Sequence, residues 1–155
     1  MMKLVNKYER DGMGHIFSIK GVLCGEKLVS GSLLKYNAEM LQKLRYQIGD
    51  LRDVERVDMT VEQMKDIAHI DCQAARDAGI MKIALVASHE LIFSLSSMYS
   101  AYAIEPCMEA KMFRNMSDAR DWVESFVTSG AFDISSPIPS TITKGDSQSS
   151  SLPTS

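Results

Sequence analysis

Cysteine is scarce in this chain, and neither a basic surplus nor a long apolar run is present. The three cysteines, Cys24, Cys72 and Cys107, are far apart and form no Cys-x-x-Cys pair. This pattern argues against a disulfide framework and against a thiolate zinc site. It indicates three reduced thiols, as expected of a cytoplasmic protein.

The charge and hydropathy patterns exclude two further classes of partner. The formal net charge is -3, and Lys and Arg form no cluster, whereas proteins that bind nucleic acid usually carry a basic face. The first residues lack the apolar run of a signal peptide. The longest uncharged stretch, 91–104, contains four serines and is too short to span a bilayer. We therefore expect no nucleic acid and no membrane insertion.

What remains is a chain of 155 residues with 45% hydrophobic residues, which suits one globular domain. Periodicity predicts strands at 4–8, 15–23, 44–50, 81–87 and 107–113, and helices at 26–41, 60–78, 88–102 and 117–127. This alternation predicts an α/β fold with a mixed, mostly parallel central sheet of about five strands and about four helices. Residues 1–129 form this domain, and 130–155, rich in serine and proline, are predicted to be a disordered tail.

The helix over 60–78 has the clearest pattern. Thr60 and Gln63 form a capping box, and Gly79 is placed to end the helix. Asp71 falls in the middle of the apolar face, where a carboxylate must be paired, hydrogen-bonded or protonated. Two interpretations stay open: a structural pair with an Arg, a His or backbone amides, or a polar group in a pocket under this helix.

The helix over 91–102 carries no charged residue. Its outer face is predicted to hold Phe93, Ser97 and Ser100, whereas its core stripe is predicted to be Leu91, Ile92, Leu95, Met98, Tyr99 and Tyr102. Interface cores are depleted in charge and hold aromatic residues. The face is therefore expected to contact a partner or a second copy, or else to be a Ser-rich exposed face.

Three stretches carry a family resemblance: 50–54, then 82–87 with 90–93, and 112–115 with 118–123. In their order and spacing the chain resembles the SpoIIAA-like branch of STAS domains, relatives of the anti-sigma-factor antagonists. The resemblance implies a compact domain used for protein–protein contact, and a distant similarity to lipid-carrying Sec14-type domains implies an apolar ligand. Phosphorylated antagonists carry a serine in an Asp-x-Ser-Gly turn, where this chain has Asp58-Met59-Thr60-Val61. Thr60 is therefore read as an N-cap.

Reactive sites are weakly indicated. Cys24 follows one predicted strand, Asp50 ends another and His89 comes after a third, which is where a hydrolase nucleophile set would lie. No nucleophile elbow or oxyanion loop accompanies them. Asp66 and His69 lie on the polar face of their helix and Cys72 on the apolar face, which argues against a metal site. No glycine-rich loop is present, and no cofactor is expected.

Three hypotheses follow. The first is a non-catalytic, homodimeric protein-interaction module that resembles STAS domains. Its partner surface would comprise Phe93, Ser97 and Ser100 and the predicted loop residues Arg52, Asp53, Asp58 and Thr60. The second is a carrier or sensor of a small apolar ligand, with Asp71 and Asp50 beside the pocket. The third is a small hydrolase built on Cys24, His89 and Asp50.

Overall fold

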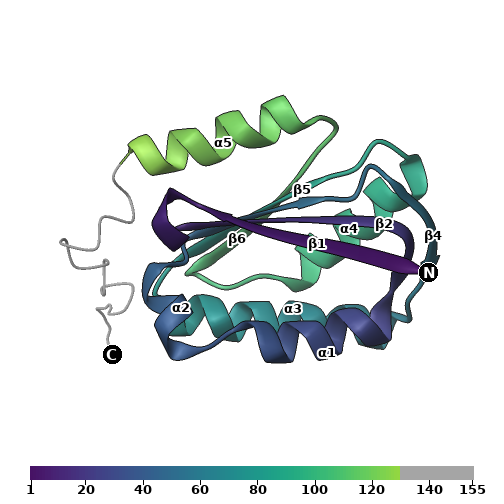
Figure 1. The fold of residues 1–155 in the computed structure, drawn as a ribbon, viewed down its shortest axis with the longest axis horizontal. Helices are drawn as coiled ribbons and strands as arrows, with labels where there is room; N and C mark the ends of the chain where they lie inside the picture. Colours follow the sequence, from purple (N-terminus) through teal and green to yellow (C-terminus); the bar gives the residue numbers. More distant parts are fainter. Residues whose placement is uncertain (130–155) are drawn as a thin grey trace, which may run out of the picture. The chain divides into compact units, whose positions relative to one another are not determined.

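The computed structural model describes residues 1–129, and the predicted tail lies outside them. Met1–Ser125 form one compact unit, and a second unit begins at Phe126. The fold described below is that of the first unit (Figure 1).

The described residues contain a six-stranded mixed sheet. Its strands are β1 (Met2–Glu9), β2 (Gly14–Cys24), β3 (Tyr46–Asp50), β4 (Val54–Asp58), β5 (Met81–Val86) and β6 (Met108–Phe113). The order is β1-β2-β3-β5-β6, with β4 paired to β2. Only β1 and β2 pair antiparallel, and the other pairs are parallel. The predicted fold class, with its opening hairpin, is confirmed.

One strand was not predicted. The first part of β2 pairs with β3, from Gly14 to Ser18, and its last part pairs with β4, from Gly21 to Cys24. The segment read as a loop from Arg52 to Thr60 thus contains a strand. Its sequence is mostly polar because only the first residue, Val54, is buried, so it gives no strand periodicity.

The helices are α1 (Gly25–Lys35), α2 (Ala38–Lys43), α3 (Val61–Ala78), α4 (Glu90–Tyr102) and α5 (Met116–Thr128). Helices α1, α2 and α3 lie on one side of the sheet, and α5 begins on the other (Figure 1). There the ring of Trp122 lies 5.6 Å from that of Phe113. Helix α4 lies beside α3, since the hydroxyl of its Tyr99 donates to Asp71 of α3. No described helix combines the length and apolar character that crossing a membrane requires.

Several helix ends differ from the prediction. The helix expected over 26–41 is two helices, because Tyr36 is extended and the Asn37 side chain caps α2 by accepting from the backbone of Met40 at 2.9 Å. His89, not Ser88, is the N-cap of α4. Asn115, rather than Ser117, accepts a backbone hydrogen bond at the start of α5, from Asp118 at 2.8 Å. Asparagine competes well for such positions because its short side chain reaches the free N–H groups.

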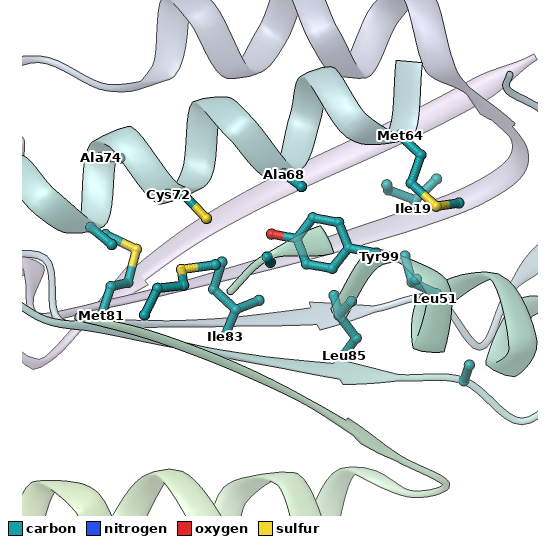
Figure 2. Packing of buried hydrophobic residues seen from close by; sticks show 14 of the residues in the cluster. Ile19, Leu51, Met64, Ala68, Cys72, Ala74, Met81, Ile83, Leu85 and Tyr99 are labelled. Atoms are coloured by element: carbon teal, nitrogen blue, oxygen red, sulfur yellow. The ribbon is translucent and has the colours of Figure 1, made fainter. Parts of the chain in front are cut away.

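Helix α3 behaves as predicted. Thr60 and Gln63 exchange the capping-box hydrogen bonds, at 2.9 and 3.1 Å, and Gly79 ends the helix with a φ of 95°, which glycine adopts without strain. The buried face of α3 packs over the sheet (Figure 2). The labelled core residues include Met64, Ala68, Cys72 and Ala74 from the helix and Ile19, Met81, Ile83 and Leu85 from the strands.

Helix α4 is rotated from its predicted phase. Ile92, Ser96 and Tyr99 are its buried residues, whereas Leu91, Met98 and Tyr102, placed in the core stripe by the prediction, are exposed. Because apolar residues occur all around this helix, periodicity alone does not decide which face turns inward.

Candidate ligand-binding cavity

A cavity of about 360 Å³ lies inside the first unit. Strands β1, β2, β3 and β5 and helices α1, α3 and α4 all contribute to its walls. Most of the lining is apolar, and it includes Phe17, Ile19, Leu28, Met64 and Ile83. A mostly apolar cavity of this size with a few polar groups is the usual form of a small-molecule site.

The polar part of the wall centres on Asp71, which is only 6% exposed. The hydroxyl of Tyr36 donates to its Oδ1 at 2.7 Å, and the hydroxyl of Tyr99 donates to its Oδ2 at 2.5 Å. The two tyrosines come from the end of α1 and from α4, so the carboxylate ties three helices together. Figure 2 shows Tyr99 reaching into the layer between α3 and the sheet.

The hydrogen bonds continue from Tyr36 into the sheet. Gln47 Nε2 donates to the Tyr36 hydroxyl at 2.6 Å, and Gln47 Oε1 lies 2.8 Å from His15 Nδ1. The other ring nitrogen, His15 Nε2, lies 2.8 Å from Asn6 Oδ1. A chain of polar side chains thus runs from β1 to α4 along the cavity wall. Such a network restrains the orientation of its members, because each side chain is held by its neighbours in the chain.

Electrostatics show how the Asp71 charge is held. Burial, followed by the negative charge of Asp71, raises the pKa of Tyr36 and of Tyr99 well above the ordinary value of 10.0. Both phenols therefore remain neutral donors at physiological pH.

The prediction that Asp71 pairs with an Arg, a His or backbone amides is wrong. Two tyrosines take that place, and since they belong to other helices, the spacing within α3 could not reveal them.

Two serine hydroxyls complete the polar wall. Ser32 on α1 is 8% exposed and Ser96 on α4 is 5% exposed, and both line the cavity. In the part of the chain that the structure describes, neither hydroxyl makes a hydrogen bond. Ser32 lies four residues before Tyr36, and Ser96 lies three before Tyr99. Each serine therefore precedes by about one helical turn a tyrosine that holds Asp71.

Sequence reasoning missed His15 and Gln47 as site residues. A signal was present, because both are polar residues inside apolar strand segments, and His15 shares its face with Phe17 and Ile19 at alternate positions. Both are fully enclosed, at 1% exposure. A buried polar side chain in a central strand indicates a partner within hydrogen-bond reach.

The second predicted pocket residue, Asp50, does not line the cavity. Its carboxylate accepts two hydrogen bonds from the Arg52 guanidinium, at 2.9 and 2.8 Å. These bonds hold the pKa of Asp50 below its ordinary value. The side chain is thus engaged locally at the end of β3, so its assignment to the pocket is corrected.

The three residues of the alternative hydrolase hypothesis are not joined to one another. Asp50 is in register with Ser18 on β2, and Cys24 lies six residues further along that strand, about 20 Å away at 3.3 Å per residue. Within residues 1–129, no hydrogen bond joins Cys24, Asp50 and His89, and no cluster of His, Cys, Asp or Glu could hold a metal.

The predicted partner-contact residues of α4 are Phe93, Ser97 and Ser100. Phe93 is half-buried rather than exposed, with the Arg114 guanidinium 3.8 Å from the centre of its ring. The hydroxyls of Ser97 and Ser100 donate to carbonyls of their own helix, at 3.0 and 2.8 Å.

The other predicted contact residues, in the segment after β3, have structural roles. The carboxylate of Asp53 lies 3.9 Å from the Lys20 ammonium. Asp58 ends β4 opposite Cys24, and Thr60 caps α3. Their use by a partner stays a prediction.

Comparisons with known proteins show a likeness in fold. No family model matches the chain, and no curated protein matches its sequence. It is similar to the crystal structure of an uncharacterised protein from Shewanella loihica, of the DUF3478 family and with a SpoIIAA-like fold. The two are 16% identical, the match covers 78% of this chain and 92% of the other, and the TM-score is 0.49. The resemblance noted in the sequence agrees with this finding.

Proposed function

We propose that this protein is a non-catalytic binding module whose cavity takes a small, mainly apolar molecule. The observation that carries the proposal is the cavity of about 360 Å³, apolar along most of its wall and polar around Asp71. Protein interiors are normally close-packed, so an apolar pocket of this size leaves its wall without contacts that close packing would supply. A bound molecule would restore those contacts.

The test is the uptake of an environment-sensitive apolar fluorescent dye by the full chain. Ser32→Phe would place an aromatic ring from a buried wall position into the cavity, whereas Ser30→Phe changes an exposed serine of the same helix. We expect Ser32→Phe to weaken dye binding at least about tenfold, an effect of about 1.4 kcal/mol. Ser30→Phe should bind like the wild type. Equal dye binding by both variants would contradict the cavity as the binding site.

A second candidate function is favoured by the exposed apolar side chains of α4. Leu91 is 64% exposed and Ile104, just beyond the helix, is 72% exposed, with Met98 also exposed. No charged residue lies between Leu91 and Ile104. We propose that this surface contacts a second copy of the chain, since two uncharged faces approach each other without like-charge repulsion.

The oligomeric state tests this second function. Leu91→Lys places a charge in the proposed interface, and Leu33→Lys is a matched control on α1 with the same 64% exposure. We expect the wild type and Leu33→Lys to show a dimer mass that depends on concentration, measured by sedimentation, and Leu91→Lys to remain monomeric. A wild type that stays monomeric at every concentration would refute the self-association.

A further inference from the structure

The head group that the cavity accepts can be inferred from the hydrogen-bonding capacity left unused in its wall. This inference rests on the proposed function, since it assumes that the cavity holds a ligand. Each carboxylate oxygen of Asp71 accepts one phenol hydrogen bond, although a carboxylate has about four acceptor positions. Both phenol protons are already committed to it. Asp71 can therefore still accept hydrogen bonds from a ligand.

The two serines supply the second, independent observation. Ser32 and Ser96 are more than nine-tenths buried and line the cavity, yet neither is hydrogen-bonded within the described residues. A hydroxyl of a buried residue that lines a cavity and bonds to no described protein group has its hydrogen-bonding capacity free for a polar group of a ligand or for ordered water. A serine hydroxyl both donates and accepts.

The sign of the charge restricts the ligand further. The Asp71 carboxylate is held by two neutral phenols, and among the side chains that the structure describes it forms no ion pair with a cation. Besides Asp71 and Tyr99, three other titratable groups line the cavity: Tyr8, the exposed Lys27 and the buried His15. His15 is engaged by Gln47 and Asn6. An anionic head group beside Asp71 would put like charges together in apolar surroundings, which is costly.

We propose that the cavity takes a small molecule with an apolar body and one hydrogen-bond-donating head group, an alcohol or a primary amine, that lies against Asp71, Ser32 and Ser96. Such a head donates to the Asp71 carboxylate and exchanges a hydrogen bond with a serine. At about 30 Å³ for a water-sized group, the cavity holds about 12 non-hydrogen atoms, which admits an eight-carbon chain with its head group.

The experiment measures the binding of octanol, octylamine and octanoate to the full chain by calorimetry and by displacement of the apolar dye. The three share one apolar body and differ in the head group. We expect octanol and octylamine to bind at least about tenfold more tightly than octanoate. Tighter binding of octylamine than of octanol identifies a cationic head group, and the reverse order identifies a neutral one.

Two variants of neighbouring serines test the contact itself. Ser96→Ala should weaken octanol binding by about three- to tenfold, the loss of one neutral hydrogen bond, and leave octanoate binding unchanged. Ser97→Ala is the matched control, because its hydroxyl bonds to the carbonyl of Phe93 within the helix, and should bind all three as the wild type does. Asp71→Asn, if circular dichroism shows that it folds, should reduce the difference in binding affinity between octylamine and octanoate.

The two proposals fail in different ways. If the dye and all three compounds fail to bind, the cavity is not a ligand site and the proposed function falls. If the dye binds but octanoate binds as well as the other two, or better, only the head-group inference is overturned. The same holds if no octyl compound displaces the dye, or if Ser96→Ala and Ser97→Ala bind octanol equally.

Discussion

The hydrogen bond between Tyr99 and Asp71 should contribute measurably to stability, and Tyr99→Phe tests it. The substitution removes the hydroxyl that lies 2.5 Å from Asp71 Oδ2 and keeps the ring that packs in the core. A hydrogen bond to a charged group contributes about 1.5–3 kcal/mol when the acceptor stays buried. Asp71 is 6% exposed, so water would compensate little of the loss. We expect the free energy of unfolding to fall by about 2 kcal/mol.

Urea denaturation followed by circular dichroism measures this change. With a slope of about 2 kcal/mol per molar urea, the midpoint should fall by about 1 M. Tyr102→Phe is the control, because Tyr102 is three residues further along the same helix and exposed, and it should change stability by less than about 0.5 kcal/mol.

If Tyr99→Phe is as stable as Tyr102→Phe, the reasoning about the buried carboxylate is refuted. The double variant Tyr36→Phe/Tyr99→Phe extends the test. It leaves Asp71 without either phenol donor, so its loss of stability should exceed the sum of the two single losses.

Three further predictions concern other parts of the fold. The hydrogen bond from Arg120, opposed by partial burial, lowers the pKa of Glu9 below its ordinary value of 4.5. The stability it contributes is therefore full above that value and is lost as pH falls through the lower folded-state pKa, so Glu9→Gln should cost about 1 kcal/mol in urea melts at pH 7 and nothing in strong acid. A Cβ at Gly31 would meet no atom within 4 Å, whereas at Gly49 it would lie 2.5 Å from a neighbouring ring. Gly31→Ala should thus raise the unfolding free energy by about 0.5–1 kcal/mol and Gly49→Ala should lower it; a loss of stability in Gly31→Ala would contradict the open space. Thr60→Ala should cost about 1 kcal/mol in the same melts, and an unchanged midpoint would show that the cap is not used in solution.

Local chemistry was sufficient to predict the order of the elements and several of their ends. The capping box at Thr60, the glycine end at Gly79 and the apolar run of β5 depend on residues a few positions apart, so their signals lie within one segment. The place of Asp71 on the apolar face of α3 was visible for the same reason. The alternation of strands and helices then implied the parallel sheet, because a parallel connection needs a crossover.

Other features depended on contacts between segments far apart in the chain. Strand β4 forms because the last part of the long strand β2 is free to pair with it. The mostly polar sequence of β4 does not by itself predict a strand. Helix α4 turned Ser96 inward and Leu91 outward, since a helix that is apolar all round takes its orientation from its neighbours.

The sequence by itself determined the α/β architecture, the capped helix α3 and the presence of a carboxylate on its buried face. Only the tertiary structure decided which side chains form hydrogen bonds with that carboxylate. Tyr36 and Tyr99 are 35 and 28 residues from Asp71 along the chain, and no periodicity within a helix encodes such a distance. The cavity, too, exists only where three helices and four strands pack imperfectly, because an unfilled volume is a property of the assembled packing and not of any one segment.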